Sequence, residues 1–93
     1  MDDIREFEWD EDKRLVNIAK HGIDFEDIGP AFDDEDARHI PDRRIDYGED
    51  RIIMIARCNG VILFVVYTLR GEKTRIISAR LANQRERAVY ERS

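Results

Sequence analysis

The chain has 93 residues, of which 42% are hydrophobic and 40% are charged, and its net charge is −5. A chain this short supports one hydrophobic core, so we expect residues 1–93 to form a single domain. The hydrophobic content excludes a disordered chain, and the high charged content argues against a membrane protein. The longest apolar run, residues 61–67, is far shorter than the roughly 20 residues that a membrane-spanning helix needs.

The charge is unevenly distributed along the chain. Residues 1–50 carry 7 basic and 18 acidic residues, a net of −11, whereas residues 51–93 carry 9 basic and 3 acidic residues, a net of +6. This asymmetry indicates either a basic binding face opposite an acidic one or a mixed surface on which the two halves interleave. The acidic N-terminus has no apolar secretory core, and a single cysteine, Cys58, cannot form an internal disulfide. We therefore expect a cytoplasmic protein.

The N-terminal third predicts a short strand followed by a helix. Residues 6–9 alternate weakly between polar and apolar side chains, as in a strand. A helix is expected over residues 10–20, with Asp10 as its N-cap and Gly22 as the left-handed residue that ends it. The apolar residues Leu15, Ile18 and Ala19 repeat at helical spacing, which supports this helix.

A second helix is expected immediately afterwards. Asp24 is suited to cap it, and Pro30 should kink or stop it near Gly29, because proline lacks the backbone N–H that a helix interior needs. The apolar residues on its inner face would be Phe25, Ile28 and Phe32. The polar stretch that follows predicts one modest strand at residues 38–45.

Three strands and a closing helix are predicted in the C-terminal half. The apolar, β-branched runs at residues 51–58 and 61–68 are separated by Asn59-Gly60, which is typical of a type I′ hairpin turn. A second turn leads into a strand at residues 73–79, and residues 83–91 are typical of a helix. The predicted fold class is α+β, an antiparallel β-sheet meander with two N-terminal helices and one C-terminal helix.

The two-residue turn also predicts the register of the hairpin, with Cys58 opposite Val61. One face of the pair then carries Ile53, Ile55, Ile62, Phe64 and Val66. The other face carries Ile52, Met54, Ala56, Leu63, Val65 and Tyr67. Both faces are apolar, although an antiparallel sheet with one face in water should alternate cleanly. We expect part of this surface to meet a protein partner, unless the sheet curls enough to bury both faces.

Several ordered blocks of this sequence resemble the BrnT family of bacterial type II toxins. The blocks are Phe7-Glu8-Trp9-Asp10, Asn17-x-x-Lys20-His21-Gly22, Phe25-Glu26, Val66-Tyr67-Thr68, Ile76-Ile77-Ser78-Ala79-Arg80 and Arg85-Glu86-x-x-x-Tyr90-Glu91. The resemblance implies a RelE-like fold and a ribonuclease that arrests growth by cutting RNA. It also implies a cognate BrnA-like antitoxin, which joins a toxin-binding segment to a ribbon-helix-helix DNA-binding part. The two proteins would form a hetero-oligomer that represses its own operon, so that the toxin meets DNA only through the antitoxin.

Lys20 and His21 are catalytic candidates that also have a structural explanation. RNA cleavage without a metal needs a base for the 2′-hydroxyl proton, cations for the charge that builds at phosphorus, and an acid for the leaving oxygen. A histidine can act as acid or base near neutral pH, and a lysine can bind phosphate. However, cations in the last turn of a helix also interact favourably with its dipole. The sequence leaves both interpretations open.

Arg57 and Arg80 are the strongest candidates for binding phosphate. Each lies in an apolar strand, where an arginine is costly without a partner, and its guanidinium fork fits two phosphate oxygens. The alternative is an ion pair with an acid such as Glu86 or Glu49. If residues along the last strand alternate simply, the side chains on one face are Ile76, Ser78 and Arg80, and those on the other are Arg75, Ile77 and Ala79.

Three further arginines are candidates for contacting RNA, namely Arg75, Arg85 and Arg87. Arg85 and Arg87 point in different directions on the closing helix, so that one can line an RNA path while the other pairs with Glu91. No metal or cofactor site is expected, because His21 and His39 are far apart in sequence and consecutive acids such as those at residues 33–36 usually form a solvated loop.

Two functions from different classes follow from these observations. The first is an endoribonuclease toxin that acts without a metal and is neutralised by its antitoxin. The second is a non-catalytic module that binds a protein or RNA through the same apolar sheet and basic C-terminal half. A toxin should arrest growth when it is produced without its partner, whereas a binding module should be tolerated.

Overall fold

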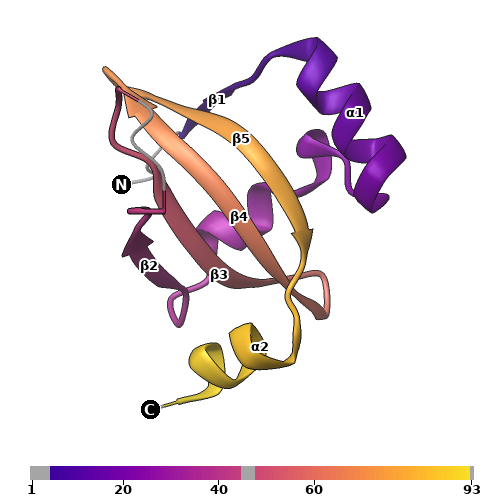
Figure 1. Ribbon diagram of the computed structural model, residues 1–93, viewed down its shortest axis with the longest axis vertical. Helices are drawn as coiled ribbons and strands as arrows, with labels where there is room; N and C mark the ends of the chain where they lie inside the picture. Colours follow the sequence, from indigo (N-terminus) through magenta and orange to yellow (C-terminus); the bar gives the residue numbers. More distant parts are fainter. Residues whose placement is uncertain (1–4, 45–47, 93) are drawn as a thin grey trace.

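A computed structural model describes residues 5–44 and 48–92 and shows an α+β domain (Figure 1). Within these residues, no helix is long and apolar enough to cross a bilayer. The strand predicted at residues 38–45 is shorter than expected, because it ends at residue 41, and residue 45 lies outside the described residues. The elements in chain order are β1 (Glu6–Glu8), α1 (Glu11–His21), the 3-10 helices η1 (Phe25–Asp27) and η2 (Gly29–Asp33), β2 (Arg38–Pro41), β3 (Ile52–Cys58), β4 (Val61–Arg70), β5 (Lys73–Leu81) and α2 (Gln84–Glu91).

The five strands form one sheet in the order β1-β5-β4-β3-β2. The strands from β2 to β5 are paired antiparallel, which confirms the predicted meander. β1 is the exception, because it lies parallel to β5 and pairs with it only over Lys73–Arg75. The second predicted helix is confirmed as two short 3-10 helices, and the chain changes from one to the other at Ile28–Gly29, where Pro30 was expected to interrupt a longer helix.

The hairpin between β3 and β4 has the predicted turn and register. Asn59 and Gly60 both have positive φ, 50° and 89°, as a type I′ turn requires. Cys58 lies opposite Val61, and the register continues without a shift to the end of β3. The two apolar faces predicted from this register are therefore the two faces of the sheet.

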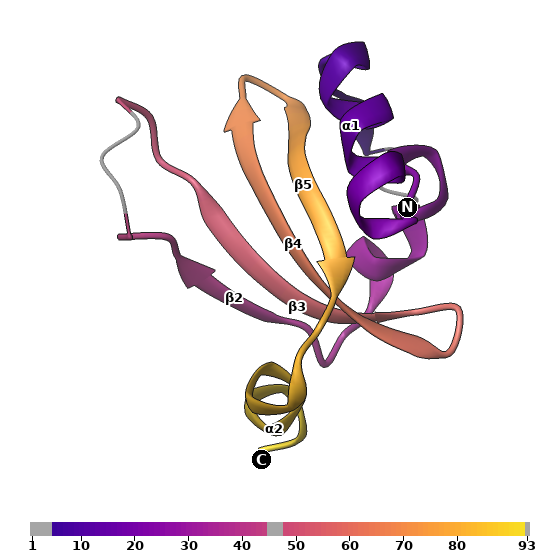
Figure 2. The same cartoon turned by 45° about the vertical axis from the view of Figure 1, so that its right-hand side comes forward.

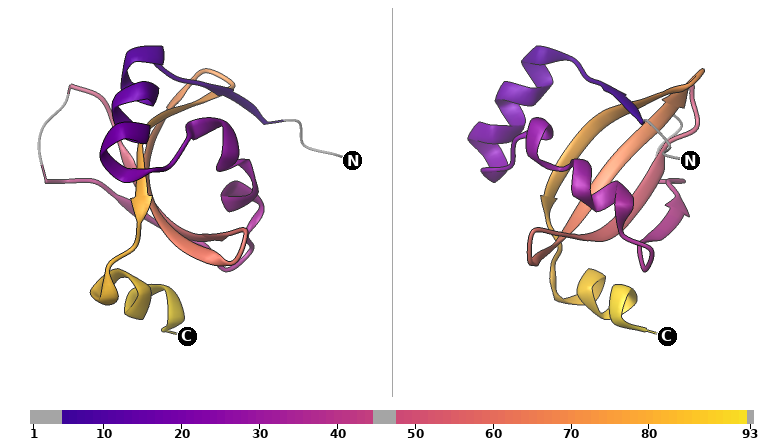
Figure 3. Two further views of the ribbon diagram at one scale, coloured as in Figure 1. Left: turned by 90° about the vertical axis from the view of Figure 1, so that its right-hand side faces the viewer. Right: turned by 180° about the vertical axis from the view of Figure 1, so that it is seen from behind.

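The face of the sheet that carries Met54, Leu63 and Val65 is called the first face here. It is covered by α1, η1 and η2, which lie in front of it in the right-hand view of Figure 3. Phe25, Ile28 and Ala31 from the 3-10 helices are almost completely buried there. Phe32 packs against the same cluster and also contacts Tyr67, with ring centroids 5.3 Å apart. The sheet contributes Met54, Ala56, Cys58, Leu63, Val65, Tyr67, Ile76 and Ala79 to this core.

The second face is partly covered by α2, which packs at one end of a strongly curved sheet (Figure 2). Ile55, Phe64 and Val66 on this face are 3%, 7% and 4% exposed, and Tyr90 of α2 packs with them. Curling of the sheet therefore buries both of its apolar faces within this chain. The apolar face of β3 and β4 is not the open docking surface that the pattern suggested.

α1 packs against β5 through a polar side chain. Asn17 is 5% exposed, and its amide donates hydrogen bonds to the carbonyls of Ala79 and Ile23 at 2.8 and 2.9 Å. Its side-chain oxygen accepts from the N–H of Ala79 at 3.1 Å. The amide therefore bonds the backbone of β5 as a neighbouring strand would, beyond the point that β1 reaches.

The apolar residues that repeat at helical spacing in α1 do not face the core. Leu15 is 53% exposed and Ala19 is also exposed, while Ile18 is only half-buried. Because Asn17 takes the inward position, the helical repeat of about 3.6 residues turns Leu15 and Val16 toward solvent. Periodicity alone does not show this, since it assumes that the apolar stripe faces the core.

Simple alternation along β5 is also wrong. The pairing with β4 shifts between Val66 and Tyr67, so that Val66 lies opposite Ser78 and Tyr67 lies opposite Ile76. This β-bulge moves Ile76 to the first face with Ala79, while Ile77 packs against the second. A bulge has no signal in the hydrophobic pattern of this strand.

We predict that Asn17→Ala lowers the free energy of unfolding by about 2–3 kcal/mol, because it leaves the buried N–H and C=O of Ala79 without partners. Urea denaturation monitored by circular dichroism measures the change. Leu15→Ala, at an exposed position of the same helix, should change stability by no more than about 0.5 kcal/mol. Equal stability of the two variants would show that the Asn17 hydrogen bonds contribute nothing.

Candidate active site

Lys20 and His21 form the last turn of α1, and the structure confirms that this turn is a regular helix end. Asp10 caps the start of the helix by accepting hydrogen bonds from the backbone of Asp12 and Lys13. Gly22 ends it with φ at 72°, and its N–H donates to the carbonyl of Ile18 at 2.8 Å. The two basic side chains thus sit where a helix favours positive charge.

The end of α1 also lines an open cleft of about 280 Å³ against β5, which we call the α1–β5 cleft. The residues that line it are Asp12, Lys13, Val16, Asn17, Lys20, His21, Ile77 and Ser78. Lys20 is exposed and His21 is half-buried, and neither forms an ion pair with any residue in the described ranges. Both side chains are therefore available to a ligand in the cleft.

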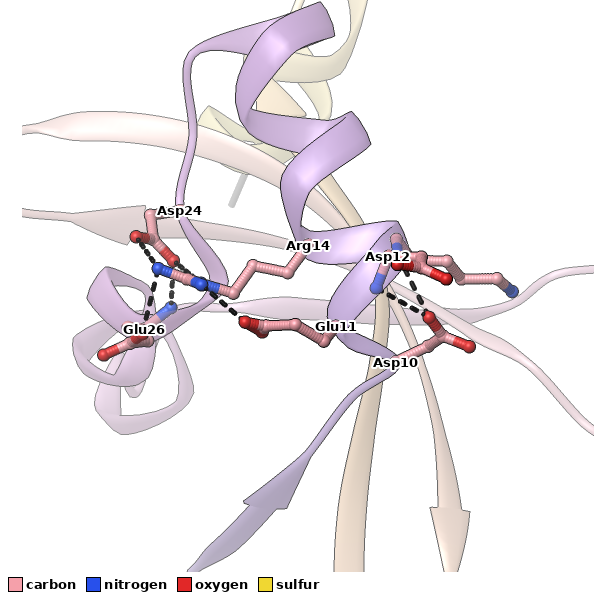
Figure 4. Close-up of polar contacts among 7 residues, drawn as sticks. Asp10, Glu11, Asp12, Arg14, Asp24 and Glu26 are labelled. Carbon is pink, nitrogen blue, oxygen red and sulfur yellow. Dashed lines mark hydrogen bonds and ion pairs between the residues drawn. The ribbon is translucent and has the colours of Figure 1, made fainter.

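Arg14 fixes the other side of α1 to the segment that follows it (Figure 4). Its guanidinium bonds both oxygens of Asp24 at 2.8 and 2.9 Å and also reaches Glu11 and Glu26. The hydrogen bonds between Arg14 and Asp24 raise the pKa of Arg14 above its ordinary value and lower the pKa of the Asp24 carboxyl. Together with Asn17, this network holds the last turn of α1 beside β5.

Arg80 lies on β5 and faces α2, where it is paired with an acid. Its two terminal nitrogens each lie 2.8 Å from an oxygen of Glu86, and its guanidinium stacks over the Phe64 ring at 4.1 Å. Burial alone would raise the pKa of Glu86, but the hydrogen bonds from Arg80 and from the backbone of Asn83 lower it overall. Arg80 therefore forms the ion pair with Glu86 that the sequence offered as the alternative to binding phosphate.

Arg57 lies on the same face, at the end of β3, and forms no ion pair within the described part of the chain. Its guanidinium lies over the Tyr90 ring at 5.7 Å, while its backbone N–H donates to Asp34 at 2.7 Å. The Tyr90 hydroxyl donates to the same Asp34 oxygen at 2.7 Å. Arg57 is exposed, so its charge remains available to a bound phosphate.

The three arginines expected to contact RNA have different environments. Arg75 is paired with Glu8 at 3.3 Å, and Arg87 donates to the Ala82 carbonyl at 2.9 Å rather than pairing with Glu91. Arg85 is exposed on α2. Tyr67 and Tyr90 are only 7% and 9% exposed and belong to the core.

The structure thus places the catalytic candidates in two groups along the end of β5. Lys20 and His21 share the α1–β5 cleft with Ser78, while Arg80 and Arg57 lie on the second face beside α2. Ser78 and Arg80 are two residues apart on a strand, a distance of about 7 Å between Cα atoms.

The sequence was compared with known protein families and with curated proteins. A family model described as "Ribonuclease toxin, BrnT, of type II toxin-antitoxin system" matches residues 9–86. The chain belongs to the BrnT family. No curated protein shows a significant match. Family membership makes this BrnT chain a ribonuclease toxin, with RNA as its substrate and a cognate antitoxin as its partner.

Sequence reasoning missed two residues that position this site in the BrnT chain. Asn17 belongs to a block that resembles the family, but its role as the clamp on Ala79 was not foreseen. Its signal was an asparagine inside a helix, where its side chain usually competes with the backbone and is disfavoured. Asp34, which joins Arg57 to Tyr90, stands in an acidic run that was interpreted as a solvated loop.

No group of three or more His, Cys, Asp or Glu side chains that could hold a metal ion occurs among residues 5–44 and 48–92. Cys58 is buried and free, and burial raises the pKa of its thiol. It is therefore not a reactive thiol. The polar and charged side chains at the candidate site are those of Lys20, His21 and Ser78, with Asp12, Lys13 and Asn17 also lining the cleft.

We predict that acid weakens the attachment of α2 through Asp34. Burial alone would raise the pKa of its carboxyl, but hydrogen bonds from the backbone of Arg57 and the hydroxyl of Tyr90 lower it below the ordinary 3.8. A carboxyl whose pKa is lower in the folded than in the unfolded state stabilises the fold at any pH above its unfolded pKa. It loses that contribution as the pH falls through its folded pKa. The free energy of unfolding should therefore fall below about pH 4, and less steeply for Asp34→Asn.

Urea titrations between pH 2 and pH 7 measure this slope, with the neighbouring Asp36→Asn as the control. Asp36 is exposed, and its substitution should leave the slope as in the wild type. Identical slopes for Asp34→Asn and the wild type would show that Asp34 does not link α2 to pH.

Proposed function

We propose that this BrnT toxin cuts RNA internally without a metal, using the α1–β5 cleft and the arginines beside α2. The observation that carries the proposal is the shared cleft of Lys20, His21 and Ser78, two residues before Arg80 on the same strand. It supplies a proton carrier and a cation in one cleft, and β5 leads from this cleft to Arg80. Growth arrest in a cytoplasmic setting and neutralisation by a BrnA-like, DNA-binding antitoxin belong to the same proposal.

The reaction that fits these groups is attack by the neighbouring 2′-hydroxyl. Its oxygen loses a proton and bonds to phosphorus, the bond from phosphorus to the 5′ oxygen breaks, and that oxygen gains a proton. The products are a 2′,3′-cyclic phosphate and a 5′-hydroxyl end. We assign one of the two proton transfers to His21, because an imidazole both accepts and donates protons near neutral pH.

The cations in this proposal stabilise the charge that develops on the phosphoryl oxygens. Lys20 is free and exposed at the cleft, so it can reach the reacting phosphate directly. Arg80 must first exchange Glu86 for phosphate, since the ion pair occupies both of its terminal nitrogens. Arg57 and Arg85 are free to contact the RNA backbone on either side, which leaves Arg75 and Arg87 with smaller roles.

We predict that purified wild-type protein cleaves a long single-stranded RNA in the presence of EDTA. His21→Ala should slow cleavage by about 10²–10⁴-fold, as expected for a lost acid or base. Lys20→Ala and Arg80→Ala should each slow it by about 10²–10³-fold, as expected for lost charge stabilisation. Gel analysis of the RNA ends identifies the cyclic phosphate.

The matched controls are His39→Ala and Lys73→Ala, which remove the same kinds of side chain away from the cleft and should retain cleavage. A wild-type rate for His21→Ala would show that this residue is only a helix end. Loss of cleavage in EDTA with recovery in Mg²⁺ would contradict a mechanism without metal. If no form cleaves RNA, growth arrest in cells would indicate dependence on the ribosome, and growth without arrest would support a binding module.

We predict that Glu86→Gln tightens RNA binding, because it releases Arg80 for a phosphate. Glutamine at this position keeps the capping hydrogen bond to the backbone of Asn83. The affinity for a 2′-O-methyl RNA, which cannot be cut, should rise several-fold, and the slope of log K against log salt should steepen by about 0.7. Fluorescence anisotropy at several salt concentrations measures both quantities.

Glu91→Gln is the control, because it removes the same charge from the same helix at an exposed side chain. If both substitutions raise the affinity equally, the gain comes from net charge, and Arg80 does not bind phosphate.

A further inference from the structure

α1 carries its apolar side chains on the side that faces solvent. Leu15 and Val16 are 53% and 61% exposed, and Ala19, one turn further along, is exposed as well. Residues at this spacing form one stripe on a helix. In a monomeric domain such a stripe normally faces the core, so an outward stripe indicates a surface that meets another molecule.

A row of positive charge runs beside this stripe. Lys13, Val16 and Lys20 follow helical spacing along the side of α1 that lines the α1–β5 cleft. Val16 and Ile77 form the apolar walls of the cleft, and both lysines are exposed at its rim. Neither lysine forms an ion pair within residues 5–44 and 48–92. The surface therefore combines an apolar groove with two lysines that form no ion pair among these residues and with one carboxylate, that of Asp12.

We propose that this α1 docking surface, made of Leu15, Val16 and Ala19 with Lys13 and Lys20, binds a segment of the cognate antitoxin. The segment would place an apolar side chain in the α1–β5 cleft and acidic side chains against the two lysines. Charge complementarity supports this chemistry, because neither lysine has an acidic partner within residues 5–44 and 48–92, although the N-terminal half is strongly acidic. An amphipathic segment in an apolar groove is a common form of peptide recognition.

The apolar stripe favours a protein over RNA as the occupant of this surface. Leu15 and Ala19 lie outside the residues that line the cleft, so the apolar area extends beyond a site for a single base. Family membership implies that an antitoxin binds this chain, whereas the use of α1 is the inference made from its surface, and the inhibitory effect, the covering of Lys20 and His21, rests on the function proposed above.

The test is isothermal titration calorimetry of purified toxin variants with the antitoxin encoded in the same operon. Val16→Asp should weaken binding by about tenfold or more, because it places a charge in the apolar groove. Lys13→Glu should weaken it several-fold, and the difference from the wild type should shrink at high salt. The controls are Val61→Asp and Lys73→Glu, which make the same changes at exposed positions of β4 and β5. They should bind like the wild type.

Circular dichroism first establishes that each variant is folded, and the binding measurement does not depend on ribonuclease activity. Wild-type affinity in both α1 variants would overturn the proposal, as would equal losses in the two controls. If Val16→Asp kept the antitoxin but lost the uncleavable RNA, the surface would be a nucleic-acid site and the proposal would be wrong. The proposal would also fail if the same variant only converted a self-associating toxin to a monomer.

Discussion

The pairing of Asn17 with Ala79 is the constraint on which the arrangement of this BrnT toxin depends. β1 covers the outer edge of β5 only at its beginning, so the backbone further along needs other partners. Asn17 supplies one donor and one acceptor to a single residue of β5 and uses its second donor on the chain that leaves α1. A buried amide with all three bonds satisfied is specific in direction, whereas an apolar contact is not. The clamp therefore fixes both the position of α1 and its rotation.

That rotation connects the packing of α1 to its surface. With Asn17 inward, Lys20 and His21 must point toward the cleft and Leu15 must point toward solvent, since all four belong to one rigid helix. A helix packed through Leu15 and its apolar neighbours would bury these side chains and would turn Lys20 and His21 away from the cleft. The use of a polar contact in the interior thus leaves the apolar residues free for a partner. Arg14, one turn before Asn17, bonds Asp24 and so holds this rotation of the helix against the segment that follows it.

The parts of the fold that sequence predicted are those set by local chemistry. The Asn59-Gly60 turn requires positive φ at two residues and therefore fixes the register of β3 and β4, and the caps at Asp10 and Gly22 fix the ends of α1. The failures depend on tertiary contacts. The inward face of α1 is decided by a hydrogen bond to Ala79, 62 residues away, and the bulge beside Ile77 by packing against two different clusters. The candidate site was predicted as residue types, but not as two groups joined by β5.

The second face shows how desolvation shapes the candidate site. An arginine on an apolar face needs a partner, and Arg80 finds one in Glu86, which also caps α2. The same carboxylate therefore holds the arginine in position and accepts the capping hydrogen bond from the backbone of Asn83. At the other end of that helix, Asp34 holds Tyr90 by a separate hydrogen bond, which does not involve Arg80. α2 is thus attached at both of its ends by separate polar contacts, and its Tyr90 packs with Phe64 in the core of the second face.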